Sequence, residues 1–271
     1  MDASAPLVSP KDLARTYHSR AYADSWELVE DYWRVMDYAA RNTALGSSAL
    51  ASRLDLPRSR IRPWVRQPDA DRKPARPDPV RAIQAAEGHG WIPARYESES
   101  FPALSRTVAW IYSGGSIDAR RFVPLFTVGG ESEFSDLKRL LDDVGAGCAI
   151  SREFEAGRAA EYRPARDASV LGRVLFLLGA PIGTKNVDAR ITLPDYLNGA
   201  PESIRREFVE VYLRNRGQRY EEKATIHFRE DRSTDYLAAL AALIEDVSGE
   251  SVTVSDRNVI VSADAARALE A

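Results

Sequence analysis

The chain has 271 residues, 37 of them basic and 40 acidic, for a formal net charge of −3. This length suits one large domain or two smaller ones, and 44% hydrophobic with 28% charged residues excludes wholesale disorder. The single cysteine, Cys148, excludes an intramolecular disulfide and a cysteine-rich zinc site, so we expect a reducing, cytoplasmic setting. No apolar run reaches the roughly 18 residues of a membrane helix, and the first 25 residues lack the apolar core of a signal peptide. We therefore expect no membrane partner.

Positive charge is concentrated between positions 41 and 81. This segment holds ten basic residues and four acids, a local net charge of +6, whereas 233–271 carries −5. Only five basic residues of the chain are lysines, so most are planar guanidinium groups that suit phosphate and guanine. A basic island in a mildly acidic chain is a candidate nucleic-acid footprint. The alternative is a solvated arginine-rich linker, which the proline-rich segment 67–79 resembles.

The segment 48–66, SALASRLDLPRSRIRPWVR, has the pattern of a helix-turn-helix. A first helix would bury Leu50 and Leu54, and a second would bury Ile61 and Val65, with Pro57 in the turn between them. Longer helices at about 26–41 and 80–87 would flank the pair. A generic helical hairpin with a basic face is the alternative interpretation.

In a helix-turn-helix, the exposed face of the second helix reaches base edges and phosphates in a major groove. The side chains predicted on that face are Arg58, Ser59, Arg60, Arg62 and Arg66. Pro63 departs from the pattern, because it removes an N–H and would kink or shorten the helix unless it lies in the first turn.

Two apolar helices that end in glycine follow, in the segments 101–117, FPALSRTVAWIYSGGSI, and 201–217, PESIRREFVEVYLRNRG. Gly115 and Gly217 are 102 residues apart. Between them lie an acidic helix at 132–144, the stretch 165–186, ARDASVLGRVLFLLGAPIGTKN, and then Leu193-Pro194. The order and spacing of these motifs resemble the LAGLIDADG homing-endonuclease family.

The resemblance implies a duplicated αββαββα unit in which the motif helices pack on a pseudo-two-fold axis and two curved sheets grip DNA. The residue pattern is compatible: 224–229 alternates with period 2, and the pairs 148–154 with 159–164 and 252–254 with 259–261 are hairpin signals. Helices at 235–247 and 263–270 would complete the second repeat. Chance alternation in an unrelated α+β domain is the alternative.

We therefore predict an α+β protein in which an all-α helix-turn-helix domain precedes a duplicated LAGLIDADG-like domain. The predicted divisions are an N-terminal arm at 1–25, the helix-turn-helix domain at 26–93, a linker at 94–100 and the double repeat at 101–271. The hairpin after each motif helix is shorter than the family's groove-reading hairpin. The residues of the second part that we expect to contact DNA are Arg120, Arg121, Lys185, Arg219, Lys223 and Arg229.

The resemblance fails at the positions that carry catalysis. In the family, each motif helix supplies a carboxylate one residue before its final glycine, and the two carboxylates hold the divalent metal ions that cleave DNA. These positions are Gly114 and Arg216, of which glycine offers no ligand and arginine places a cation where a metal must bind. We therefore predict no catalytic residue, no metal site and no cofactor.

Two hypotheses follow from these patterns. The first is a sequence-specific DNA-binding protein, a transcription regulator, with a catalytically inactive LAGLIDADG-like domain used for DNA backbone contact, dimerisation or effector sensing. Its partners would be double-stranded DNA, a second copy in a homodimer and, as a candidate, a small-molecule effector. The second is a metal-dependent endonuclease with relocated ligands, or an RNA maturase-like protein.

Overall fold

In a computed structural model of the protein, the described residues are 5–65, 73–153, 159–185, 191–220 and 224–270. They fall into two compact units, one formed by residues 9–88 and the other by residues 5–8 together with 89–270. Within these ranges, no helix combines the length and the apolar character that crossing a membrane requires.

The unit 9–88 is entirely helical. Its helices are α1 (Pro10–Arg15), α2 (Ser25–Arg41), α3 (Ser47–Leu54), α4 (Arg58–Ile61) and α5 (Asp78–Gly88). Helix α1 starts with a capping box, in which Ser9 and Asp12 exchange hydrogen bonds with each other's backbone N–H groups. Val29 and Val35 of α2 are fully buried, as are Leu13 of α1 and Val80 of α5. These apolar residues give the unit a core of its own.

Helices α3 and α4 are joined by residues 55–57, and the left-handed Asp55, at φ 53°, ends α3. The second helix is much shorter than the sequence pattern predicts, because α4 ends at Ile61. Pro63 cannot donate a backbone hydrogen bond to the carbonyl of Ser59, so the helix cannot continue past this point. Ile61, Trp64 and Val65 are nevertheless all buried, as the pattern indicates.

The other unit contains two repeats with the same order of elements. The first consists of α6 (Phe101–Gly114), β1 (Gly115–Ile117), β2 (Pro124–Val128), α7 (Glu131–Asp143), β3 (Cys148–Arg152), β4 (Ala160–Pro164) and α8 (Ala168–Leu177). After a 3-10 turn, η1 (Asp195–Asn198), the second consists of α9 (Glu202–Arg216), β5 (Gln218–Tyr220), β6 (Thr225–Arg229), α10 (Thr234–Ser248), β7 (Val252–Ser255), β8 (Asn258–Val261) and α11 (Ala263–Glu270).

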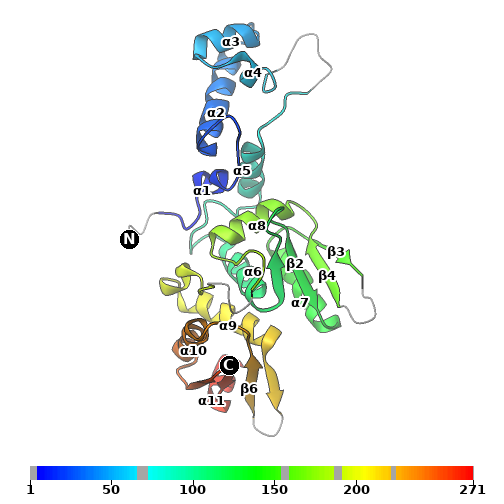
Figure 1. Cartoon of the computed structure of the whole chain (residues 1–271), viewed down its shortest axis with the longest axis vertical. Helices are drawn as coiled ribbons and strands as arrows, with labels where there is room; N and C mark the ends of the chain where they lie inside the picture. The colour runs from blue at the N-terminus through cyan, green and yellow to red at the C-terminus, as the bar shows by residue number, and fades with distance from the viewer. Residues whose placement is uncertain (1–4, 66–72, 154–158, 186–190, 221–223, 271) are drawn as a thin grey trace. The chain divides into compact units, whose positions relative to one another are not determined.

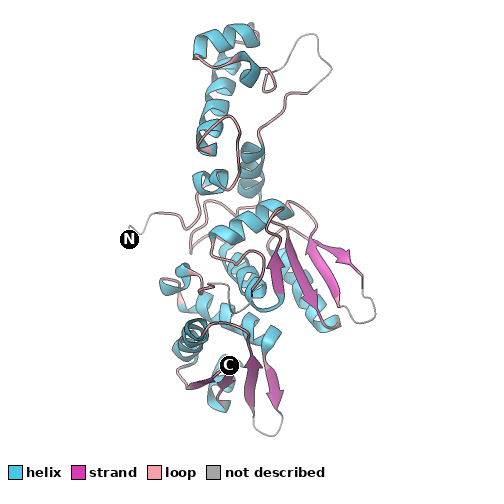
Figure 2. Cartoon of the chain, in the orientation of Figure 1, coloured by secondary structure: helices cyan, strands magenta, loops and turns pink. Residues whose placement is uncertain are grey.

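Each repeat forms a four-stranded antiparallel sheet with the same topology, β1-β2-β4-β3 in the first and β5-β6-β8-β7 in the second. Helices α6, α7 and α8 contact the first sheet, and α9, α10 and α11 contact the second (Figure 1). Figure 2 shows the two sheets as separate groups of strands among helices. The predicted duplicated αββαββα architecture is confirmed. The first hairpin of the first repeat is short, with strands of three and five residues.

The division between the units falls after Gly88, whereas the sequence predicts domain limits at 25/26 and 93/94. The predicted arm contains α1, which packs against α2 and α5. The predicted linker starts at Ala94, which is fully buried and pairs with Val8 in an antiparallel bridge. Both segments are therefore integrated into the packed units instead of running outside them.

Candidate nucleic-acid interface

The two motif helices, α6 and α9, form the most extensive contact between any two elements of the described chain. Gly217 allows α9 to approach its own sheet closely, because a Cβ there would lie 2.5 Å from Ile226 Cγ2 and 2.6 Å from the Leu213 carbonyl oxygen. The helices are also linked to each other, since Asn215 Nδ2 donates a hydrogen bond to Ser113 Oγ at 2.9 Å. The paired helices form the centre of this unit.

Gly114 and Arg216, which occupy the family's carboxylate positions, lie at the ends of these helices. Arg216 is held in place by a buried acid, because its Nε donates to Glu230 Oε1 at 2.7 Å. The same carboxylate oxygen accepts a hydrogen bond from the Tyr212 hydroxyl at 2.8 Å. Only 3% of Glu230 is exposed. The guanidinium group at position 216 is thus part of an ion pair and cannot act as a ligand for a metal ion.

The end of α6 is stabilised by two cations. Lys185 Nζ donates to the backbone carbonyls of Ile111, Tyr112 and Gly115. Arg232, which is 7% exposed, donates to the Tyr112 carbonyl at 3.2 Å. Positive groups at a helix C-terminus satisfy its unpaired carbonyls and its negative dipole end.

Burial lowers the pKa of Lys185 from 10.5 to about 7, and the nearby positive charge of Arg232 acts in the same direction. Because its ammonium group serves these carbonyls, Lys185 stabilises α6 and is not placed to contact DNA. Glu230 and Arg232 have structural roles that the sequence does not reveal. They lie in the charged run that follows a predicted strand, and nothing in that run distinguishes buried residues from exposed ones.

The second sheet presents one face to the helices and the opposite, outer face away from them. Ile226 and Phe228 are buried on the helix side, so alternation places Thr225, His227 and Arg229 on the outer face. Arg219 pairs directly with Ile226 across the β5–β6 ladder and therefore lies on the helix side. The structure thus separates the predicted contact residues Arg229 and Arg219 onto opposite faces.

In the first repeat, Arg120 and Arg121 lie exposed in the turn between β1 and β2. Asp118 Oδ1 fixes this turn by accepting both of their backbone N–H groups, at 3.0 and 2.6 Å. Both arginines are therefore presented at one end of the first sheet. Lys223, the candidate from the corresponding turn of the second repeat, lies outside the described residues.

In the unit 9–88, the structure divides the predicted recognition residues. Arg58 and Ser59 are exposed on α4, and Arg62 is exposed directly after it. Arg60 instead packs within the unit, with its guanidinium 4.2 Å from the Tyr22 ring centroid and 4.0 Å from an Asp31 carboxylate oxygen. Arg66 lies outside the described residues. The exposed basic surface at α4 therefore consists of Arg58 and Arg62 with Ser59 between them in sequence.

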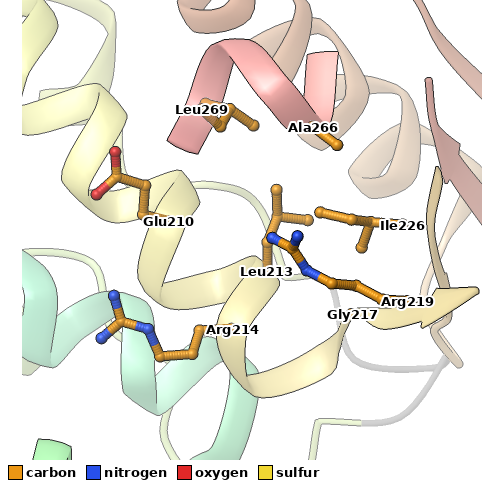
Figure 3. Close-up of a pocket in the computed structure, with 8 residues that line it drawn as sticks. All are labelled: Glu210, Leu213, Arg214, Gly217, Arg219, Ile226, Ala266 and Leu269. Carbon is orange, nitrogen blue, oxygen red and sulfur yellow. The ribbon is translucent and has the colours of Figure 1, made fainter. Parts of the chain in front are cut away.

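Across the residues that the structure describes, no cluster of three His, Cys, Asp or Glu side chains is arranged to hold a metal ion. A cavity of about 750 Å³ lies in the second repeat and is lined by residues of α9, β5, β6 and α11, with Gly217 (Figure 3).

Comparisons with known proteins give no match to a protein-family model and none to a curated protein. Among solved structures, the chain is similar to the N-terminal LAGLIDADG domain of DUF199/WhiA, with a TM-score of 0.44, 11% identity, and coverage of 67% of this chain and 87% of that one. It is also similar to full-length DUF199/WhiA from Thermatoga maritima, with a TM-score of 0.45, 10% identity, and coverage of 67% of this chain and 59% of that one.

The element order, the sheet topology and the paired motif helices define the class of fold. The double-repeat unit has a LAGLIDADG-like fold, with glycine and an ion-paired arginine at the positions where the resemblance places carboxylates.

Proposed function

We propose that this chain is a sequence-specific DNA-binding protein, a transcription regulator that binds duplex DNA without cleaving it. The observation that carries the proposal is the ion pair between Arg216 and Glu230, at 2.7 Å, in a motif helix whose counterpart ends in Gly114. Two-metal hydrolysis needs carboxylates that bridge hard cations. Glycine and a paired guanidinium supply neither ligands nor negative charge, whereas the surrounding fold is complete.

Recognition of bases is assigned to the exposed surface at α4. Arginine can make bidentate hydrogen bonds to guanine, and a serine hydroxyl can reach either a base or a phosphate. Arg58, Ser59 and Arg62 are exposed there. The short α4 limits the number of base contacts that one copy can make. A homodimer that reads two half-sites would compensate for this limit, and we include it in the proposal.

The double-repeat unit contributes contacts to the phosphate backbone. The candidate residues are Arg120 and Arg121 in the β1–β2 turn and Arg229 on the outer face of the second sheet. We assign DNA reading to the helical unit 9–88 and the supporting role to the double repeat, 101–271. Because backbone contacts carry no sequence information, they would raise affinity without selecting the site.

The test is to select bound fragments from a pool of genomic DNA in the presence of EDTA, and then to incubate the selected duplex with the protein and Mg²⁺. We expect enrichment of a defined site, affinity that is unchanged by EDTA, and intact DNA after incubation. Recovery of no preferred sequence would contradict the recognition role. Metal-dependent cutting, or preferential recovery of structured RNA from a mixed pool, would instead favour the nuclease or maturase-like alternative.

A further inference from the structure

Helix α4 is too short to hold its conformation by itself. It spans four residues, and Pro57 before it supplies no side-chain hydrogen bond to the start of the helix. A first helical turn is costly to form, because several backbone angles are fixed for few hydrogen bonds, so an isolated helix of this length does not persist in water. The orientation of the exposed side chains at α4 must therefore come from tertiary contacts.

The C-terminal end of α4 is held by apolar packing on α2. Ile61 is fully buried, and Trp64, which follows the helix, is buried as well. The Trp64 ring meets the Tyr32 ring of α2 edge to face, with centroids 5.6 Å apart. These contacts anchor one end of α4 to the core of the unit 9–88.

A polar contact holds a different side of the same helix. The Arg60 guanidinium lies 4.2 Å from the Tyr22 ring centroid, Nη1 lies 4.0 Å from Asp31 Oδ2, and Nη2 donates to the Ala21 carbonyl at 3.3 Å. The Tyr22 hydroxyl donates to the same Asp31 oxygen at 2.7 Å. The side chains of Arg60 and Asp31 are only 25% and 19% exposed. We call Tyr22, Asp31 and Arg60 the arginine clamp.

The arginine clamp lies on the side of α4 opposite to its exposed arginines. Arg58 and Arg62 are four residues apart and share one face, whereas Arg60, two residues from each, is turned by about 200° around the helix axis. The backbone of Arg62 keeps helical angles, φ −50° and ψ −41°, so this geometry extends to it. Holding Arg60 therefore sets the direction in which Arg58 and Arg62 point.

We propose that Tyr22 and Asp31 are positioning residues for DNA recognition, which clamp Arg60 and thereby fix the face of α4 that carries Arg58 and Arg62. This inference rests on the proposed function, and it gives a role to Tyr22, which lies outside the helix-turn-helix segment 48–66. Bidentate hydrogen bonds to guanine require a guanidinium aligned with the base edge, so a rotation of α4 loses them. Phosphate contacts tolerate a rotation better, because they depend mainly on charge. The arginine clamp should therefore control sequence preference more than total affinity.

The test compares Tyr22→Leu, which removes the ring, with Tyr22→Phe, which loses only the hydroxyl. Fluorescence anisotropy of the full-length variants gives the affinity ratio between the selected duplex and a scrambled one. Tyr22→Leu should lower this ratio about tenfold, and Tyr22→Phe should retain most of it, because the ring still stacks on Arg60. Asp31→Asn, the second variant, should lower the ratio several-fold. The matched control is Tyr38→Leu, the same change at another half-buried tyrosine of the unit, which should keep the natural ratio.

A double-variant cycle separates positioning from a merely structural role. If Tyr22→Leu only lowers the folded fraction, Arg58→Ala will weaken binding to the selected duplex by the same factor in both backgrounds. If the arginine clamp positions Arg58, then Arg58→Ala should weaken binding less in the Tyr22→Leu background, where the side chain is already misaligned. Circular dichroism checks that each variant is folded. Equal factors, or an unchanged affinity ratio in Tyr22→Leu and Asp31→Asn, would overturn the proposal.

Hydrogen exchange without DNA tests the arginine clamp independently of the proposed function. The backbone N–H groups of Arg60 and Arg62 donate to the carbonyls of Pro57 and Arg58, at 2.9 Å each. Their exchange should be about tenfold faster in Tyr22→Leu, while exchange in the core of α2 stays unchanged. If the natural protein prefers no DNA site, the recognition role falls with the proposed function, and the exchange rates still decide whether the clamp orders α4. If it prefers a site and Tyr22→Leu exchanges and discriminates as the natural protein does, only this inference fails.

Discussion

Asn215 and Ser113 occupy equivalent positions in the two motif helices, two residues before Gly217 and Gly115 respectively. Asn215 Nδ2 donates a hydrogen bond to Ser113 Oγ at 2.9 Å. The Ser113 hydroxyl in turn donates to the Ala109 carbonyl at 2.8 Å. One repeat thus contributes the donor and the other the acceptor to a bond close to the pseudo-two-fold axis. If both positions carried the same side chain, either one could act as the donor.

Removing this bond should destabilise the double-repeat unit. Asn215→Ala and Ser113→Ala are each expected to lower the free energy of unfolding by about 1 kcal/mol, the usual net value of one such bond. The double variant should lose less than the sum, because both changes remove the same interaction. Urea denaturation followed by circular dichroism measures the cycle, and Thr43→Ala, an exposed position in the other unit, serves as control. Strict additivity would show that the bond contributes nothing.

Replacing the two partners of the ion pair, Arg216 and Glu230, should lower the free energy of unfolding by different amounts. Glu230 also lies 3.7 Å from Arg232 Nε, and both of these side chains are almost fully buried. Glu230→Gln would leave the buried Arg232 without a counter-ion and should cost about 3 kcal/mol of unfolding free energy. Arg216→Gln should cost about 1 kcal/mol, because the side chain of Arg216 is 38% exposed and Glu230 keeps Arg232 and Tyr212 as partners. Equal losses in thermal denaturation would contradict this assignment of roles.

The lowered pKa of Lys185 links stability to pH. The folded protein releases the Lys185 proton near pH 7, while the unfolded chain keeps it up to about 10.5, so unfolding takes up a proton between these values. The contribution of Lys185 to the free energy of unfolding should therefore rise with pH across this window, by about 1 kcal/mol per pH unit, and should be constant well below pH 7. Lys185→Met should remove the slope. Denaturation at pH 6, 7.5 and 9 compares the two proteins, and parallel curves would disprove the prediction.

The sequence predicts the helices α6 and α9 from local signals, because periodic apolar positions and the glycines that follow them mark their extent. The two matching sheets are predicted by the resemblance of the motif order to the LAGLIDADG family. The contacts of individual side chains are harder to predict from the sequence. Lys185 and Arg60 belong to residue types that are usually exposed, yet one serves the carbonyls of α6 and the other packs on Tyr22. Both depend on partners far away in the sequence, which no local pattern specifies.

The same dependence on distant partners explains why the sequence does not predict which face of the second sheet Arg219 occupies. Alternation over 224–229 predicts that Arg229 lies on the polar face of a strand, but the face of Arg219 depends on the register of the β5–β6 ladder. Arg219 pairs with Ile226 and so joins the helix side, where the cavity lies. The length of α4, in contrast, can be predicted from a local feature, because Pro63 indicates a kinked or shortened helix and α4 ends at Ile61.

The surface at α4 predicts how DNA binding responds to arginine substitutions. Arg58→Ala and Arg62→Ala should each weaken binding to the selected site by about 1–3 kcal/mol if the side chain contacts a base. Arg60→Ala should instead lower the stability of the unit 9–88, because it removes the contacts to Tyr22 and Asp31. Arg20→Ala, at an exposed position outside the basic segment 41–81, is the control. Fluorescence anisotropy with selected and scrambled duplexes separates affinity from specificity, and unchanged values for both Arg58 and Arg62 variants would remove α4 from the interface.

The salt dependence of the same binding reaction reports the number of phosphate contacts. With about five such contacts, the logarithm of the affinity should fall with the logarithm of salt concentration with a slope of roughly −5. The slope should become shallower by about one for each phosphate-contacting arginine that is removed, and Arg121→Ala and Arg229→Ala test this for the double-repeat unit. A nearly flat dependence would mean that the basic residues are only solvated.

Position 216 yields the sharpest prediction: the natural protein should not cleave duplex or single-stranded DNA with Mg²⁺ or Mn²⁺. A unit charge 4 Å from another interacts with about 4 kcal/mol at an effective dielectric constant of 20, and a divalent ion doubles this repulsion from Arg216. Gly114→Asp with Arg216→Asp would introduce a negative charge at the end of α6 and reverse the charge at the end of α9. A Cβ at position 114 would lie 3.3 Å from Trp110 Nε1, so a modest shift of the indole admits the new side chain. The double variant should gain measurable affinity for Mn²⁺ by calorimetry, even without turnover.

The matched control is Gly114→Asn with Arg216→Asn, which has the same shape but no charge and should bind no metal. If the control binds equally well, or if the natural protein cuts DNA in a metal-dependent way, then the helix ends do not have the roles assigned to them and the regulator proposal falls with that assignment.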